Sequence, residues 1–263
     1  MNNVKCALVL GSSGGIGAAM VSEFLCDPDI DQVFAVSRLE QPTAINDASV
    51  AEKLTWLQSD YSEVSMTDVA DILKSRCGSF AKVCICHGVL HSESLWPEKR
   101  LDDLNEDNLH RIFQSNTVVP AIWLKVLFKV LKGDTDCVVA ALSARVGSIG
   151  DNKLGGWYGY RASKASLNMI LKTASVEYAR RAKNVKFISF HPGTTDTELS
   201  KPFQSAVAAS NLFSPEFVAE KLSAIMDSVP IDGELSFLDW NGKEIDLYLI
   251  HISEPTRREG IAY

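Results

Sequence analysis

Short apolar runs alternate with amphipathic stretches along most of this chain. The first run, Val4 to Leu10, is followed by a stretch from Gly14 to Leu25 that carries Ile16, Met20 and Phe24 at fourfold spacing. These patterns predict a buried strand and then a helix packed on it. Further strands are predicted at Val33–Ser37, Leu54–Gln58, Lys82–Cys86, Asp136–Leu142, Val185–Phe190 and Leu235–Leu238. Nearly continuous apolar strands separated by helices indicate an α/β fold, a doubly wound parallel sheet of about seven strands with helices on both faces.

Three segments depart from the simple alternation. Residues 107–132 contain Pro120 but keep helical apolar spacing, which predicts a long helix with a kink. Residues 198–213 are rich in small side chains, which suits a substrate loop or lid before a helix near Pro215 that Ser214 would cap. We expect one domain over residues 1–245. The stretch 246–263 loses the pattern, and a non-native or disordered tail and a genuine extension both stay open.

Composition narrows the class of protein. A chain of 263 residues with 46% hydrophobic content can bury the core of one α/β domain. Its net charge of −7 provides no basic field for nucleic acid or anionic membrane. The N-terminal apolar run is too short for a signal peptide, and no eighteen-residue apolar stretch occurs. The six cysteines lack metal-ligand spacing, so we expect reduced, buried thiols, no metal and a cytoplasmic protein.

A glycine-rich turn connects the first strand to the first helix. The sequence Gly11-Ser-Ser-Gly-Gly15-Ile-Gly17 includes Ser13 and Ile16. At this position the backbone can approach a pyrophosphate, and the amides of the helix N-terminus can meet its negative charge. An ordinary strand-to-helix turn is the alternative, but the position favours a nucleotide site.

The end of the second predicted strand bears on the choice of nucleotide. A site for NAD usually presents an acidic residue here, whereas this chain presents Ser37 and Arg38. Guanidinium groups bind phosphate with good geometry, so Arg38 favours NADP over NAD. A solvated surface arginine is the alternative, and Glu40 could pair with Arg38 or take the place of a ribose-binding acid.

Tyr160 and Lys164 are four residues apart in a predicted helix, so they share one face of it. A phenol can donate a proton to a carbonyl oxygen that accepts a hydride. A nearby ammonium and an oxidised nicotinamide would lower the phenol pKa from its ordinary value of about 10. The spacing alone is weak evidence, and its context decides.

In order along the chain, these residues resemble the short-chain dehydrogenase/reductase family, from Gly11 to about Gly242. The resemblance implies a Rossmann-type fold and a set of site residues. It implies that Asp60 contacts adenine, that Asn116 anchors a proton-relay water, and that Lys164 also holds the nicotinamide ribose. It also implies that the turn after the sixth strand holds the nicotinamide carboxamide, through Pro192, Gly193, Thr195 and Thr197. Local strings such as SARVGSI are similar to the C-factor or sniffer-like carbonyl reductase branch.

Two features depart from the family pattern. The family's Asn-Asn-Ala-Gly reads Ile85-Cys86-His87-Gly88, so only Gly88 matches, and we interpret His87 and His91 as packed or loop residues. The catalytic serine has two possible registers. Counting back from Gly147 gives Ala144, whereas the end of the apolar strand gives Ser143. We choose Ser143, with Ser148 as the alternative.

The sequence therefore predicts an NADP(H)-dependent oxidoreductase acting on a small, apolar carbonyl or alcohol, with a homodimer or homotetramer implied by the resemblance. Tyr160 would be the acid/base, Lys164 would lower its pKa, Ser143 would polarise the carbonyl, and Asn116 would relay protons. Trp96, Trp157 and Tyr158 would wall the pocket. A dinucleotide-binding signalling protein with little turnover is the alternative from another class. An epimerase or dehydratase of the same superfamily is disfavoured, because the chain lacks the C-terminal length that such enzymes use over sugar nucleotides.

Overall fold

A central sheet of seven parallel strands organises the computed structural model, which describes residues 4–41 and 52–247. Most of the predicted tail, residues 248–263, lies outside the described residues. The strand order is β3-β2-β1-β4-β5-β6-β9, and every neighbouring pair is parallel. The strands are β1 (Lys5–Leu10), β2 (Gln32–Ser37), β3 (Leu54–Gln58), β4 (Ser79–Ile85), β5 (Cys137–Leu142), β6 (Val185–His191) and β9 (Leu235–Asp239). This is the predicted doubly wound arrangement.

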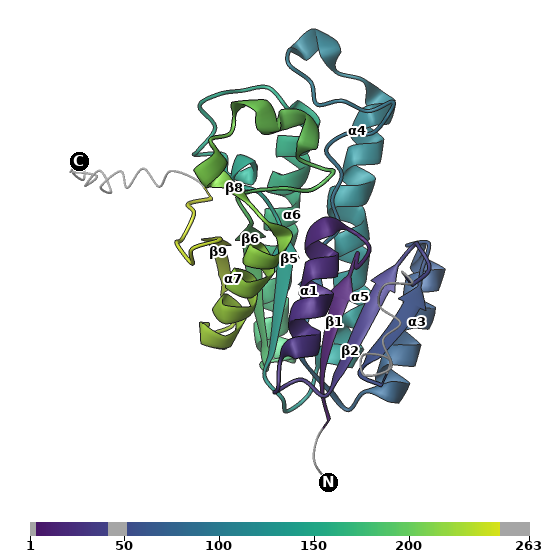
Figure 1. Cartoon of the computed structure of the whole chain (residues 1–263). Coiled ribbons are helices and arrows are strands. Elements are labelled where there is room, and N and C mark those ends of the chain that lie inside the picture. Colours follow the sequence, from purple (N-terminus) through teal and green to yellow (C-terminus); the bar gives the residue numbers. More distant parts are fainter. Residues whose placement is uncertain (1–3, 42–51, 248–263) are drawn as a thin grey trace, which may run out of the picture.

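Helices cover both faces of the sheet (Figure 1). Helices α1 (Gly15–Cys26) and α7 (Pro215–Ser228) pack together on one face, where Phe24 and Leu222 join a core cluster with the strands. Helices α3 (Glu63–Arg76), α5 (Val119–Leu131) and α6 (Tyr158–Arg181) cover the other face, where Trp123 and Leu171 are fully buried. Apolar burial on both faces explains why the strands are nearly continuous apolar runs.

The predicted long helix with a proline consists of three consecutive elements. These are α4 (Glu106–Phe113), a π-helical turn η3 (Gln114–Val118) and α5. Pro120 lies in the first turn of α5, directly after the π turn, where its missing N–H does not interrupt a regular helical ladder. The π turn contains Asn116, so the irregularity coincides with a candidate site residue.

The predicted substrate loop and the cap that follows it are both formed. The loop contains the 3₁₀ turns η5 (Lys201–Ala206) and η6 (Ala209–Asn211), and strand β8 (Leu212–Phe213) pairs with β7 (Thr194–Thr195). The Ser214 hydroxyl accepts a hydrogen bond from the Phe217 amide at 3.1 Å, which confirms the predicted N-cap of α7.

The cysteines differ from the expectation. Cys6 at the start of β1 and Cys77 after α3 form a disulfide, with their Cα atoms 6.5 Å apart. Sequence spacing could not reveal this pair, because the sheet brings together positions 71 residues apart. The other four cysteines are free thiols, so the prediction of reduced, buried thiols is wrong for this pair, and the predicted burial is also wrong for Cys26, which is exposed. Disulfides are rare in reducing compartments, so the cysteines no longer support a cytoplasmic location.

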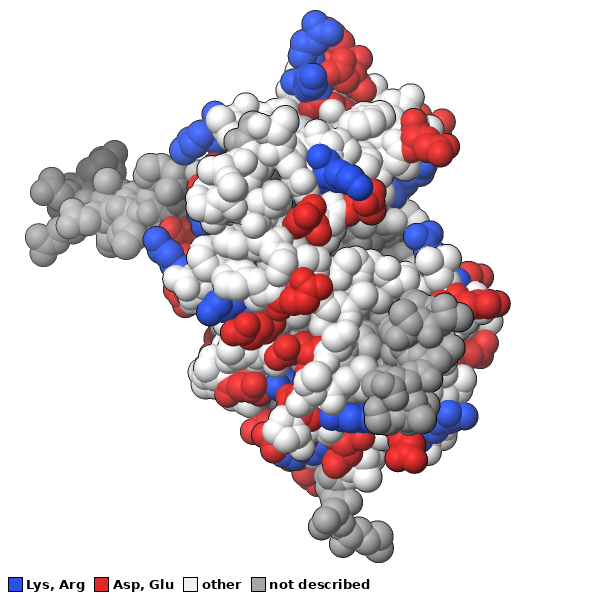
Figure 2. All heavy atoms as spheres, viewed as in Figure 1, with Lys and Arg blue, Asp and Glu red and all other residues white. Residues whose placement is uncertain are grey.

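Charged side chains of both signs are interspersed over the face shown in Figure 2. No helix in the described part of the chain is long and apolar enough to cross a membrane.

Candidate active site

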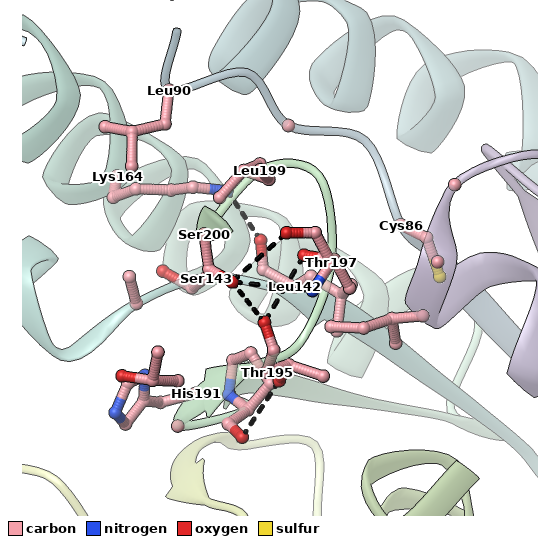
Figure 3. Close-up of a pocket in the computed structure, with 18 of the residues that line it drawn as sticks. Cys86, Leu90, Leu142, Ser143, Lys164, His191, Thr195, Thr197, Leu199 and Ser200 are labelled. Carbon is pink, nitrogen blue, oxygen red and sulfur yellow. Dashed lines mark hydrogen bonds between the residues drawn. The ribbon is translucent and has the colours of Figure 1, made fainter. Parts of the chain in front are cut away.

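A cavity of about 740 Å³ opens at the carboxyl ends of the parallel strands. It lies where the strand order reverses between β1 and β4, which is the usual position for a ligand in open α/β sheets. The glycine turn, the ends of β4 and β5, the start of α6 and the loop after β6 form its wall. Figure 3 shows several of these side chains around it.

The glycine turn is shaped for close backbone approach. Gly11 has a φ of 84°, and its amide donates to the Val36 carbonyl at 2.9 Å. A Cβ at Gly17 would lie 2.2 Å from the Gly11 oxygen, and one at Gly15 would lie 2.6 Å from Thr197 Cγ2. The buried Ser12 hydroxyl has no hydrogen-bond partner among the described residues. Ser12 does not line the cavity, whereas Gly14, Gly15 and Gly17 do, and their close-packed backbone at the start of α1 fits a dinucleotide phosphate. Ser13 and Ile16 also line the cavity.

The residues predicted to contact the adenine half lie outside the cavity wall. The Ser37 hydroxyl accepts a hydrogen bond from the Leu39 amide at 2.9 Å. Asp60 is exposed and accepts a hydrogen bond from the Ser62 amide, which holds the pKa of Asp60 below its ordinary value. The Arg38 guanidinium carbon lies 5.7 Å from the ring centroid of Tyr61. Arg38 directly follows the last residue of β2, as predicted from the sequence.

Helix α6, which carries Tyr160 and Lys164, begins at an unusual backbone conformation. Trp157, the residue before α6, has a left-handed φ of 53° and provides no side-chain cap. The buried Glu98 carboxylate accepts a hydrogen bond from the Gly159 amide at 3.1 Å, and the Glu98 carbonyl accepts one from Trp157. A carboxylate at a helix N-terminus is favourable because free amides and the helix dipole attract negative charge. Glu98 thus fixes the turn that precedes Tyr160.

Tyr160 and Lys164 lie together in the cavity wall. The Lys164 ammonium nitrogen is 5.8 Å from the Tyr160 ring centroid, and it donates to the Leu142 carbonyl at 2.7 Å. Burial raises the pKa of Tyr160 to about 12 and lowers the pKa of Lys164 to about 8. The expected lowering of the phenol pKa is therefore not found in the protein alone, because desolvation dominates. The phenol is protonated at neutral pH.

Ser143 lies in the wall, but its hydroxyl is engaged elsewhere. It donates to the Asn168 side-chain oxygen at 2.7 Å, and the Ser189 hydroxyl donates to the same oxygen at 2.7 Å. In this geometry its proton cannot polarise a carbonyl. The alternative, Ser148, does not line the cavity and bonds to the Asp246 carbonyl. Ala144, the other register, lines the cavity and packs in one apolar cluster with Tyr160.

Asn116 is fully buried and holds the segment after β4. Its side-chain oxygen accepts from the Val89 amide at 2.7 Å, and its amide nitrogen donates to the Val89 carbonyl and the Ser163 hydroxyl. A Cβ at Gly88 would lie 3.5 Å from Lys164 Nζ and 3.8 Å from the Asn116 oxygen. Gly88 thus lies next to both polar groups, at ordinary contact distance.

The turn after β6 completes the wall. Gly193 has a φ of 72°, and a Cβ there would lie 2.7 Å from the Phe213 ring, so both conformation and space require glycine. Thr195 is buried, and Ser200 bonds to the Thr195 and Thr197 carbonyls. Thr195, Thr197 and Ser200 are labelled in Figure 3, with these hydrogen bonds dashed. Pro192 also lines it.

The sequence analysis predicted some cavity residues and missed others. Trp157 lines the cavity as expected, with its ring 6.1 Å from that of Tyr160. Trp96 is half exposed and packs against His91 and Phe203 near the cavity. Tyr158 is not part of the wall. Leu199 and Phe203 also line the cavity, and both lie within the predicted substrate loop 198–213. Arg145 and His191 line it without having been given a role, although each directly adjoins a predicted motif.

His87, read from the sequence as a packed or loop residue, is packed. Its ring meets the Tyr61 ring edge-on at 4.4 Å, and burial lowers its pKa to about 3. Across residues 4–41 and 52–247, no group of three or more His, Cys, Asp or Glu side chains could hold a metal ion.

The short chain dehydrogenase family model matches residues 5–208 of this chain. The chain belongs to the short-chain dehydrogenase/reductase family. The match covers the glycine turn, Asn116, Tyr160 and Lys164, together with the turn after β6.

Individual relatives are more distant. The chain is 31% identical over 109 residues to 1-hydroxy-2-glutathionyl-2-methyl-3-butene dehydrogenase from Rhodococcus sp. strain AD45, which is 41% of this chain and 46% of that protein. The structure of carbonyl reductase Sniffer of D. melanogaster superposes with a TM-score of 0.78 at 20% identity, over 93% of this chain and 99% of that one. The NADPH-bound carbonyl reductase from chicken fatty liver gives a TM-score of 0.75 at 19% identity, over 93% and 99%. These short-chain dehydrogenase/reductase structures share its fold.

Proposed function

We propose that this protein reduces a carbonyl compound to an alcohol with NADPH. The observation that carries the proposal is the buried Tyr160 hydroxyl, whose pKa of about 12 keeps it protonated in a cavity it shares with Lys164. Reduction consumes a proton at the carbonyl oxygen, so a protonated phenol is the form that this direction needs. The Lys164 ammonium lies 5.8 Å from the Tyr160 ring centroid, where it would stabilise the phenolate left after this proton transfer.

Each residue has a proposed task. The bound dinucleotide would supply the hydride. Tyr160 donates its proton to the oxygen, and the Lys164 ammonium stabilises the phenolate that remains and holds the ribose. Lys164 Nζ and the Asn116 oxygen both border the space at Gly88, so a water there could return a proton to Tyr160. Ser143 can assist the carbonyl only after its hydroxyl turns from Asn168.

The test compares Tyr160→Phe with Ser143→Ala. Tyr160→Phe should lower kcat for carbonyl reduction at least about 1,000-fold, since the proton donor is lost, while NADPH binding stays near wild type. Ser143→Ala should lower kcat less than about 10-fold, because its hydroxyl serves Asn168 in this geometry. A broad panel of ketones and aldehydes, followed by NADPH oxidation, measures both. Undiminished turnover by Tyr160→Phe would sink the assignment.

One observation favours a second function. If the Ser143 hydroxyl remains hydrogen-bonded to Asn168, the carbonyl oxygen of a substrate lacks its second hydrogen-bond donor. The protein would then bind dinucleotide and signal its occupancy with little turnover. Reproducible Tyr160-dependent reduction in the same panel removes this alternative.

NADP is the proposed cofactor, because Arg38 directly follows β2, where a 2′-phosphate would lie. Arg38→Ala should weaken NADPH binding about 10- to 100-fold and leave NADH binding within about twofold, since only NADPH carries the phosphate. Fluorescence titration with both dinucleotides measures this. Tighter binding of NADH than NADPH by the wild type would contradict the proposal.

The oligomer is proposed to be a dimer through α5 and α6. A second hollow of about 790 Å³ lies between these helices and α3, with Phe128 and Ile170 in its wall. Sedimentation equilibrium tests this proposal, and a monomer at micromolar concentration would refute it.

A further inference from the structure

One charged side chain in the cavity wall has no task in the proposed proton transfer. Arg145 begins the 3₁₀ turn η4 (Arg145–Gly147), between Ala144 and Val146, and all three line the cavity. Its side chain is 45% exposed. The turn η4 packs against α6, the helix that carries Tyr160, so Arg145 belongs to the substrate end of the cavity.

The Arg145 guanidinium forms an ion pair with Asp239 that leaves most of the guanidinium N–H donors without a hydrogen bond. Arg145 Nη2 lies 3.5 Å from Asp239 Oδ2. Within the described part of the chain, the guanidinium makes no hydrogen bond. The Asp239 side chain is only 11% exposed, and it accepts hydrogen bonds from the Asn241 and Lys243 amides, both at 3.0 Å. A guanidinium has five N–H donors, so most remain available to a ligand.

The other charged groups of the wall do not compete with Arg145. Glu198, the acidic residue of the wall, pairs with Lys201 at 2.9 Å. Lys164 donates to Leu142 and is assigned to the ribose. His191 carries no charge at neutral pH, because burial first and the Arg145 charge second lower its pKa to about 4. Of the cations in the described wall, Arg145 is therefore the one that keeps N–H donors for a ligand while it is paired with Asp239.

The apolar part of the wall lies close by. The Trp157 ring is 5.2 Å from that of Phe203 and 6.1 Å from that of Tyr160. Leu90 joins the cluster that contains Ala144 and Tyr160. This surface would cover a flat, apolar group, while the guanidinium would bind an anion beside it.

On the basis of the proposed reductase function, we propose that Arg145 binds a carboxylate of the substrate, which is an aromatic oxo-carboxylate. A carboxylate presents two coplanar oxygens that match the donor fork of a guanidinium. A neutral ketone would leave that fork unpaired inside the cavity. Arg145 would thus select the substrate and take no part in proton transfer.

The kinetic experiment compares acids with their methyl esters. The probes are phenylglyoxylate, 4-acetylbenzoate and 4-oxo-4-phenylbutanoate, each beside its ester, with NADPH oxidation as the readout. Wild type should prefer at least one acid over its ester by about 10- to 100-fold in kcat/KM, the range for a charge-assisted hydrogen bond. Arg145→Gln should remove this preference while ester reduction stays within about twofold. Arg145→Lys should restore part of it. Arg180→Gln, an exposed arginine at the far end of α6, is the matched control.

A binding experiment keeps the inference testable without turnover. Calorimetry of the NADPH-loaded protein with benzoate, phenyl phosphate and methyl benzoate should show binding of benzoate that Arg145→Gln weakens about 10-fold or more. Equal benzoate binding by wild type and Arg145→Gln, or none by either, overturns the proposal. Preference for phenyl phosphate overturns the carboxylate assignment. Ester reduction that depends on Tyr160, without any effect of Arg145, leaves the reductase standing and refutes only this inference. Benzoate binding that depends on Arg145, without reduction of any probe, supports the anion site at Arg145 and refutes the reductase function.

Discussion

Lys164 illustrates how burial changes the chemistry of a single residue. Its ammonium has one hydrogen bond, to Leu142, and desolvation lowers its pKa to about 8. An ordinary lysine with a pKa near 10.4 stays charged throughout the neutral range. The charge that we propose to stabilise the Tyr160 phenolate is therefore lost within an accessible range of pH.

We expect kcat/KM for NADPH-dependent reduction to fall as pH rises through about 8. The sign follows because the charged lysine is the active form and a lowered pKa makes it neutral above this value. Lys164→Arg keeps its charge, so the fall should disappear in that variant, although its absolute rate will drop. Initial rates between pH 6 and 10 measure both profiles. A profile that falls equally in the two proteins would rule out Lys164 as its source.

The sequence predicted which residue types form the site better than it predicted how their side chains are oriented. The four-residue spacing was enough to place Tyr160 and Lys164 together, because a helix fixes which residues share a face. No local pattern could show that Ser143 faces Asn168, since that contact joins the end of β5 to α6. The lowered lysine pKa and the raised tyrosine pKa also depend on burial, which spacing does not encode.

At the scale of elements, the start of α6 depends on a residue 60 positions earlier. Trp157 cannot cap the helix, so the buried Glu98 carboxylate takes that role from the loop after β4. A glycine at 159 leaves room, since a Cβ there would lie 2.9 Å from the Glu98 oxygen. Contacts of Glu98 therefore fix the loop after β4 against the start of α6.

Glu98→Ala should lower the free energy of unfolding by about 1 to 2 kcal/mol, the usual cost of losing a helix cap. It should also lower kcat/KM, because Trp157 and Tyr160 directly follow the lost contact. Glu98→Gln keeps an oxygen acceptor and should lose less in both respects. Urea unfolding and steady-state kinetics measure these effects. Wild-type stability of Glu98→Ala would contradict the role assigned to Glu98.

At the scale of the whole molecule, one buried cation ties the sheet to both helices of one face. Lys82 in β4 pairs with Asp27, after α1, at 2.9 Å and with Asp227 in α7 at 2.6 Å. Burial alone would raise the pKa of Asp27, but the hydrogen bonds from Lys82 and from the Asp29 amide, together with the charges of Lys82 and Lys53, hold this pKa below its ordinary value. A carboxylate with a lowered pKa stabilises the fold above its unfolded pKa, and this contribution is lost as pH falls through the folded one.

Lys82→Met should lower the free energy of unfolding by about 3 kcal/mol at pH 7, because Asp27 is left buried without its partner. The loss should shrink below about pH 4, where protonation of Asp27 removes the unpaired charge. Urea unfolding at pH 7 and pH 3 gives both values, with the exposed Lys74→Met as control. An equal loss at the two pH values would exclude Asp27 as the cause.

The sequence predicted the fold well because strand and helix periodicity is local. Leu54–Gln58 is identical in the prediction and the structure, whereas β4 begins at Ser79, three residues before the predicted start. Ser79 pairs with Lys5 in β1, a contact that apolar patterning does not record. The sequence placed Lys82 at the first position of a strand. Its burial is explained only by its ion pairs with Asp27 and Asp227.

The disulfide changes how this protein responds to proteolysis. Because Cys6 and Cys77 are joined covalently, one backbone cut between them leaves a single molecule of unchanged mass apart from the added water. A gel without reductant would show such a nicked protein as intact. Adding a thiol reductant would release the pieces and reveal where the protease had entered.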